Sequence, residues 1–208
     1  MKAVLKSKEE GIPPFPRIDF LSAQLAYRRR FGGGRRQLIA KAVGLSKHQN
    51  ITVLDLTAGL GQDACVLAML GCKVTMLERS PFMADLLRDG LMRAQSAAWF
   101  RELKLTLVEE DALHYLPNLV ALSDVIYYDP MYPERKKSAW PKQGMRLLRQ
   151  IVGDDNDAPR VLELALKKAN QRVVVKRPRL APVVEGFQPS YVYSGKSSRY
   201  DVYVPTTK

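Results

Sequence analysis

A strand, a glycine turn, a helix and a second strand follow one another in the first half of the chain. The apolar, β-branched run at 51–56 predicts the first strand, and the tight turn Gly59-Leu60-Gly61 follows it. A helical pattern covers 65–70, and the second strand at 73–77 ends in Glu78. Gly59 and Glu78 are 78 − 59 = 19 positions apart, close to the spacing at which nucleotide-binding folds place a carboxylate on a ribose. This order of elements predicts an α/β fold that binds a nucleotide-like ligand.

Alternating strands and helices continue along the chain and predict a mostly parallel sheet covered on both faces. The runs 191–193 and 200–204 alternate around a turn at Gly195 and predict a closing antiparallel hairpin. We expect a basic N-terminal extension at 1–50, loose in its proline-rich beginning, and one main domain at 51–208. The other expected elements are helices at 36–43, 84–98 and 158–169, the last with Asp157 as a candidate cap, and strands at 104–108, 125–128 and 172–176.

The glycine turn departs from the fingerprint that binds dinucleotides. That fingerprint seats a pyrophosphate on a helix N-terminus, but Ala64 stands at its third glycine position. Alanine is sometimes accepted there, so a nicotinamide cofactor stays open, although Asp63 would repel a pyrophosphate. S-adenosylmethionine fits better, because it has no phosphate and because Asp55 and Asp63 would attract its sulfonium and ammonium. A simple helix-dipole role is the alternative for Asp63.

The tetrapeptide Asp129-Pro130-Met131-Tyr132 follows the predicted strand at 125–128. The carboxylate of Asp129 can accept hydrogen bonds from an amine, and Pro130 stiffens the turn. Tyr132 offers a ring on which a flat base can stack. The segment therefore suits a planar base that carries an exocyclic amino group, with an ordinary Asp-Pro turn as the alternative.

The net charge of +12 comes from clustered basic residues. Two of the clusters follow predicted strand ends, at the edge where open α/β sheets bind ligands. Because phosphate contacts supply much of nucleic-acid affinity, the clusters predict a polyanionic substrate, and a solvated basic face is the alternative. The residues expected to bind RNA are Arg28, Arg29, Arg30, Arg35, Lys136, Lys137, Lys176 and Arg177.

Neither a metal site nor a membrane segment is expected. Cys65 and Cys72 lack a metal-binding spacing and are expected to be buried, reduced thiols, while His48 and His114 are isolated. No apolar run reaches the ~18 residues of a membrane span, and the start lacks the apolar stretch of a signal peptide. A cytoplasmic location is the expectation.

Several stretches together resemble the ribosomal RNA small subunit methyltransferase J family. Its members are class I S-adenosylmethionine-dependent enzymes that methylate a guanine N2 in 16S rRNA. The arginine–glycine stretch at 27–35 and Asp-Pro-Met-Tyr-Pro at 129–133 are the most specific matches, and the resemblance runs from about Ile18 to the C-terminus. The other matching stretches are 57–64, 71–79, 137–139, 172–178 and the flanks of Leu45.

The resemblance implies a Rossmann-like methyltransferase fold, S-adenosylmethionine as cofactor, and 16S rRNA or the small ribosomal subunit as partner. With such a substrate, we expect catalytic roles for Asp129, Pro130 and Tyr132. Other classes stay open on the residues alone: an adenine-N6 nucleic-acid methyltransferase, a non-catalytic RNA-binding protein or a nicotinamide oxidoreductase. The resemblance implies a cofactor pocket of Gln62, Asp63, Glu78, Arg79, Glu110, Asp111 and Asp129, to which the strand end and glycine turn add Asp55, Gly59 and Gly61.

Overall fold

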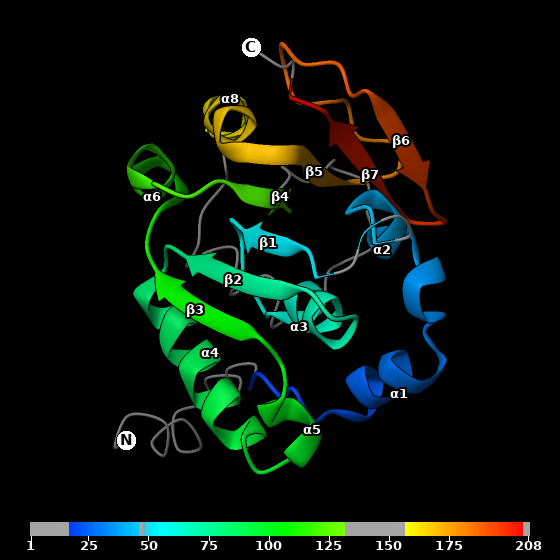
Figure 1. Ribbon diagram of the computed structural model, residues 1–208, viewed down its shortest axis with the longest axis vertical. Coiled ribbons are helices and arrows are strands. Elements are labelled where there is room, and N and C mark those ends of the chain that lie inside the picture. Colours follow the sequence, from blue (N-terminus) through cyan, green and yellow to red (C-terminus); the bar gives the residue numbers. More distant parts are fainter. Residues whose placement is uncertain (1–16, 46–47, 49, 132–156, 206–208) are drawn as a thin grey trace, which may run out of the picture.

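The computed structural model describes residues 17–45, 48, 50–131 and 157–205, which are built around one seven-stranded sheet (Figure 1). The strand order is β3-β2-β1-β4-β5-β7-β6. The first five strands of this order run parallel, and β7 pairs antiparallel with both β5 and β6. This topology confirms the predicted mostly parallel sheet and its C-terminal hairpin. The strands are β1 (Thr52–Asp55), β2 (Lys73–Glu78), β3 (Leu105–Glu109), β4 (Ser123–Tyr128), β5 (Ala169–Pro178), β6 (Tyr191–Ser194) and β7 (Ser198–Tyr203).

Helices cover both faces of this sheet, and each face has its own hydrophobic core. Side chains alternate along β1 and β4, so Val53 and Val125 enter one core while Leu54 and Ile126 enter the other. Helices α1 to α5 contribute to the first core, and α6 and α8 to the second. None of the described helices has both the length and the apolar character to cross a bilayer. The helices are α1 (Ala23–Phe31), the 3-10 turn η2 (Gly34–Arg36), α2 (Leu38–Ala42), α3 (Gln62–Met69), α4 (Pro81–Ala94), α5 (Ala98–Arg101), α6 (Ala112–Asn118) and α8 (Ala158–Lys168).

The described part of the basic N-terminal extension, residues 17–45, packs into the first core. Phe20, Leu25 and Ile39 are all buried there among side chains of the sheet and its helices. The approach is close, because a Cβ added at Gly61 would lie 2.8 Å from Cζ of Phe20. The buried residues of 18–45 therefore share a core with the sheet.

The helices and strands follow the predicted order, but several bounds differ. The helix expected at 84–98 begins earlier, at Pro81, where Oγ of Ser80 accepts a hydrogen bond from the amide of Met83. It also ends earlier, at Ala94, because Ala97 has an extended backbone that separates α4 from α5. α2 is shorter than expected, and β5 starts earlier.

Candidate active site

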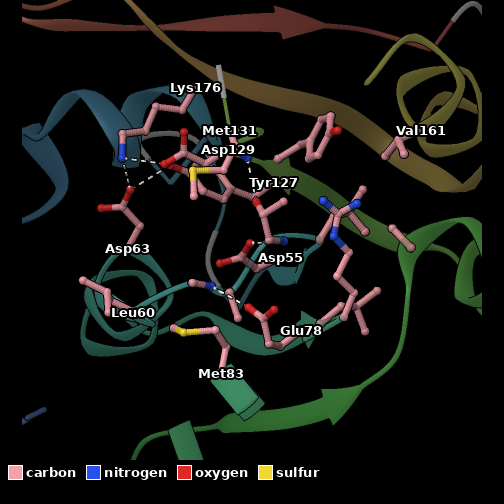
Figure 2. A pocket seen from close by; sticks show the side chains of 18 of the residues that line it. Asp55, Leu60, Asp63, Glu78, Met83, Tyr127, Asp129, Met131, Val161 and Lys176 are labelled. Atoms are coloured by element: carbon pink, nitrogen blue, oxygen red, sulfur yellow. Dashed lines mark hydrogen bonds and ion pairs between the residues drawn. The ribbon is translucent and has the colours of Figure 1, made fainter. Parts of the chain in front are cut away.

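A cavity of about 310 Å³ lies where the parallel strands end (Figure 2). Residues at the ends of β1, β2 and β4 and the first turn of α3 form much of its wall, and residues of α6, α8 and β5 complete it. Ligands of open α/β sheets bind at this edge, because the turns after neighbouring parallel strands converge there. The fold therefore brings the glycine turn and the Asp-Pro segment, which are far apart in sequence, to one place.

Glu78 anchors the glycine turn beside the cavity. Its Oε2 accepts a hydrogen bond from the amide of Gly59 at 3.0 Å, and its Oε1 accepts one from the amide of Ser80 at 2.9 Å. The Glu78 side chain is only 5% exposed, and it lines the cavity. Gly59 has φ 52°, in the left-handed region that favours glycine. The turn thus holds its backbone close to a carboxylate at the end of β2.

Lys176 of β5 joins two carboxylates from different elements. Its Nζ donates to Oδ2 of Asp63 on α3 and to Oδ2 of Asp129 after β4, each at 2.8 Å (Figure 2). The hydroxyl of Tyr127 donates to the same Asp63 oxygen at 2.8 Å. Nη1 of Arg28 lies 3.4 Å from the other Asp63 oxygen, Oδ1. This network links α1 to Asp63 and, through Lys176, to Asp129, and both carboxylates line the cavity.

The carboxylates around Lys176 ionise differently from ordinary ones. Burial opposes the ionisation of Asp63, but the charge and hydrogen bond of Lys176 outweigh it and lower the pKa of Asp63. Burial likewise opposes the ionisation of Lys176, yet Asp129 and Asp63 raise its pKa above the ordinary value. Burial raises the pKa of Asp55 to about 7, although its Oδ1 accepts a hydrogen bond from the amide of Thr57 at 3.0 Å. Asp55 therefore holds a proton near neutral pH more readily than an ordinary carboxyl group does.

A second acidic region lies toward α6 and α8. Asp111 caps α6, with its Oδ1 accepting from the amide of Leu113 at 2.7 Å. Asp157 was expected to cap α8, but its side chain makes no capping hydrogen bond; its Oδ2 lies 3.6 Å from Nη1 of Arg79 instead. Oδ1 of Asp157 is buried and has no hydrogen-bond partner in the described part of the chain. A ligand that carries a hydrogen-bond donor could satisfy this oxygen.

Most of the predicted cofactor residues meet in this cavity, but two do not line it. Gly61 has φ 68° and packs against Phe20, so its position serves the shape of the turn. Glu110 is exposed at the end of β3, with its Oε1 3.9 Å from Nδ1 of His114. The predicted residues that do line the cavity are Asp55, Gly59, Gln62, Asp63, Glu78, Arg79, Asp111 and Asp129.

The predicted RNA-binding residues are spread over different environments. Arg29, Arg30 and Arg35 are exposed. Lys176 faces the cavity instead of an outer surface. Arg177 is only 4% exposed, and its Nη2 donates to the carbonyl of Pro182 at 2.6 Å, which argues against a phosphate contact. Pro130 is buried next to Asp129, and Tyr132, Lys136 and Lys137 lie outside the described residues.

The cavity residues that the sequence analysis does not identify as site residues include Thr57, Tyr127 and Asp157. Oγ1 of Thr57 accepts from the amide of Asp129 at 2.7 Å and so fixes the turn after β4. Tyr127 was interpreted only as part of an apolar strand. Its place two residues before Asp129 was a usable signal, because strand residues two apart face the same side.

The cavity wall carries excess negative charge, which decides between candidate ligands. Such a wall repels a pyrophosphate and attracts a ligand that carries a sulfonium and an ammonium. S-adenosylmethionine therefore fits the residues present. No group of three or more His, Cys, Asp or Glu side chains suited to a metal occurs within the described ranges. The wall contains Asp55, Asp63, Glu78, Asp111, Asp129 and Asp157 against Arg79 and Lys176.

Known proteins resemble this chain over most of its length. A family model described as "Putative SAM-dependent methyltransferase" matches residues 3–205. A Ribosomal RNA small subunit methyltransferase J from Coxiella burnetii (strain RSA 331 / Henzerling II) is 62% identical over 187 residues, which are 90% of this chain and 74% of that protein. The protein of the same name from Ectopseudomonas mendocina (strain ymp) is 52% identical over 190 residues, with 90% and 73% covered. The crystal structure of a SAM-dependent methyltransferase from Neisseria gonorrhoeae has a TM-score of 0.71 at 41% identity and covers 91% of this chain and 74% of that one.

Proposed function

Because the chain belongs to the ribosomal RNA small subunit methyltransferase J family of S-adenosylmethionine-dependent enzymes, we propose that it methylates the N2 amine of a guanine in 16S rRNA. One observation carries the proposal. Asp129 after β4 and Glu78 at the end of β2 open into the same cavity, so a base held by one would meet a cofactor held by the other. The proposed partner is 16S rRNA, free or in the small ribosomal subunit, and the proposed location is the cytoplasm.

The cofactor is S-adenosylmethionine, and the two acidic regions of the cavity suit its two ends. Glu78 would accept hydrogen bonds from the ribose hydroxyls. Asp111 and Asp157 would flank the adenine. Oδ1 of Asp157, which has no partner among the described residues, can accept a hydrogen bond from the adenine amino group. Asp55 and Asp63 would face the sulfonium and the ammonium. Gly59, Gln62 and Arg79 would complete the wall.

The proposed chemistry rests on positioning of two bound partners. S-adenosylmethionine supplies a methyl group that is electrophilic because it is bonded to a positive sulfur. A guanine N2 is a poor nucleophile, since its lone pair is delocalised into the ring, and a hydrogen bond to Asp129 would localise that pair on nitrogen. The new carbon–nitrogen bond forms as the carbon–sulfur bond breaks, with its electron pair remaining on sulfur. The methylated nitrogen then loses a proton to Asp129 or to water, and Tyr132 would stack on the base.

We also assign Lys176 a positioning role in this reaction. Only an ionised carboxylate is purely a hydrogen-bond acceptor, and this is the form that an incoming amine requires. Asp63 and Asp129 lie close enough to Asp55 that their charges oppose its ionisation, so three carboxyl groups repel one another here. The ammonium of Lys176, 2.8 Å from Oδ2 of Asp129, offsets that repulsion and orients the carboxylate.

The decisive experiment analyses nucleosides of 16S rRNA by mass spectrometry from cells with and without the gene. We expect N2-methylguanosine to fall in its absence, to return with the wild-type gene, and to stay low with Asp129→Asn. Asp85→Asn is the matched control, because Asp85 is exposed on α4 and does not line the cavity. A change in N6-methyladenosine instead would favour the adenine enzyme. An unchanged set of methylated nucleosides would refute an rRNA substrate.

A further inference from the structure

One side of α1 exposes two aromatic rings in the middle of a basic segment. Tyr27 and Phe31 are each 65% exposed, and their ring centroids are 5.1 Å apart. Residues four apart on a helix lie on the same side, so the rings form one continuous surface, which we term the α1 aromatic face. The helix also carries Arg28, Arg29 and Arg30 and contains no acidic residue. This face therefore combines stacking surface with positive charge.

Contacts on the opposite side of α1 fix its orientation. Leu25 is buried in the core, about 200° around the helix from Tyr27. The guanidinium of Arg29 stacks over the ring of Trp99 on α5, 4.3 Å from its centroid. These two contacts hold the helix with its aromatic face directed outward.

Helix α1 contacts the wall of the cavity through Arg28. Arg28 makes the 3.4 Å ion pair with Asp63, and Asp63 lines the cavity wall. Phe31 follows Arg28 by three residues and is therefore only about 60° away around the helix. A nucleic acid that delivers a base to Asp129 would have its neighbouring nucleotides within reach of this face.

We propose that the α1 aromatic face stacks on an unpaired base of the RNA that flanks the target nucleotide. The proposal rests on the proposed function, which makes RNA the partner. Aromatic side chains stack on bases whose own stacking has been opened, and duplex bases are already stacked on each other. The enzyme accordingly recognises its target in a single-stranded loop or an opened helix. Arg30, whose guanidinium lies 5.8 Å from the Phe31 ring centroid, supplies charge for the adjoining phosphate.

Charge argues against a second copy of this chain as the occupant. A symmetric dimer through this face would bring the arginines of one helix against those of the other, and like charges across an interface oppose association. RNA phosphates instead complement the arginines.

The test compares RNA affinity of the wild type with the double variant Tyr27→Ala/Phe31→Ala. The probe is a fluorescent single-stranded RNA of about 12 nucleotides, alone or annealed to its complement, and anisotropy is measured at several salt concentrations. We expect roughly ten-fold weaker binding of the single strand and little change for the duplex. The slope of log K against log salt should stay the same, because no charge is removed.

Matched variants separate stacking from a general loss of structure. Tyr27→Phe/Phe31→Tyr keeps both rings and should keep the affinity. Tyr191→Ala truncates an exposed tyrosine on β6, at the sheet edge, and should bind as the wild type does. Each single alanine variant should show a partial loss, which keeps the test valid if the double variant folds poorly. S-adenosylmethionine affinity, by calorimetry, should be equal in all of them.

Three results would overturn the proposal. The first is unchanged single-strand affinity in the double variant, and the second is an equal loss for single strand and duplex. The third is a wild-type dimer that the double variant dissociates, which would make this face an interface between copies. Failure of the proposed function would look different, since wild-type enzyme would bind the probe by stacking and yet leave 16S rRNA unmethylated.

Discussion

The charge of Lys176 sets the ionisation of the carboxylates that surround it. In Lys176→Met the cation is lost, so the pKa of Asp63 should rise and Asp129 loses the charge that favours its ionised form. If methyl transfer requires ionised Asp129, the acidic limb of the pH–rate profile should move up by about one pH unit or more, and activity should recover at high pH. Lys176→Arg, which keeps the charge, should shift the limb far less. The other charged and titratable groups around Lys176 and Asp129 are Arg28, Asp55, Asp63, Tyr127 and Tyr200, and the variant leaves all of them unchanged.

The pH–rate profile distinguishes this role from a structural one. A variant that merely folds less well would lose activity by a similar factor at every pH. Lys167→Met, on the exposed side of α8, controls for removal of a lysine. A flat loss in Lys176→Met would contradict the role assigned to Lys176.

Ionisation of Asp55 gives the cavity a negative charge but lowers the stability of the folded protein. Its folded-state pKa of about 7 exceeds the ordinary 3.8, so the folded state binds this proton more tightly than the unfolded state. Stability contributed by the protonated group is therefore lost as pH rises between these two values. Asp55→Asn should raise the free energy of unfolding by an amount on the order of a few kcal/mol near pH 8, and by less near pH 5.

Denaturant unfolding at both pH values measures this difference, and calorimetry should show weaker S-adenosylmethionine binding. A stability gain that is the same at both pH values would mean that Asp55 titrates normally.

Glu78 is predicted to hold the cofactor through a charge-assisted hydrogen bond. Glu78→Ala should weaken S-adenosylmethionine binding by about 1.5–3 kcal/mol in calorimetry, and it also removes the anchor of the glycine turn. Glu163→Ala, an exposed carboxylate on α8, is the control. Unchanged cofactor affinity in the Glu78 variant would remove Glu78 from the site.

The glycine turn before α3 packs closely against Phe20 of the N-terminal segment. Gly61→Ala combines a positive φ with a Cβ that would lie 2.8 Å from Phe20, so it should cost about 2–4 kcal/mol. Gly71 also has a positive φ, 97°, but an added Cβ would meet nothing within 4 Å. Gly71→Ala should therefore cost only about 1 kcal/mol. Equal losses in denaturant unfolding would mean that Phe20 moves aside freely.

Positive and negative charges are concentrated in different regions of the molecule. The chain has a net charge of +12, yet the cavity wall is mainly acidic. RNA phosphates should therefore be held outside the cavity while a neutral base enters it. Arg30→Ala/Arg35→Ala removes two exposed charges and should lower the magnitude of the slope of log K against log salt for single-stranded RNA by about 1.4.

Cofactor affinity of this arginine variant should not change. Arg160→Ala/Lys167→Ala removes the same charge from exposed positions on α8, which packs on the other face of the sheet, and should change the slope little. Equal effects from both double variants would indicate diffuse attraction instead of a defined RNA path.

Local sequence patterns were sufficient to anticipate the frame of the site. A glycine turn after one strand and an acidic residue at the end of the next are local features, and parallel strands necessarily end at the same edge. The sequence therefore predicts that Glu78 and Asp129 lie near one ligand. The helix bounds were less predictable, because the interruption between α4 and α5 depends on one extended residue, Ala97.

The remaining features of the site depend on packing between segments that are far apart in the sequence. Lys176 lies 113 positions from Asp63 and 47 from Asp129, and their triangle exists because β5 is laid beside β4. Alternation along β5 predicts that Lys176 and Arg177 face opposite sides, but a basic cluster in sequence does not reveal which side holds the carboxylates. The same limit applies to residues 18–45, whose charge suggests an extension while their buried side chains complete the core. Which side chains of distant segments meet depends on packing between elements, and local sequence patterns do not describe that packing.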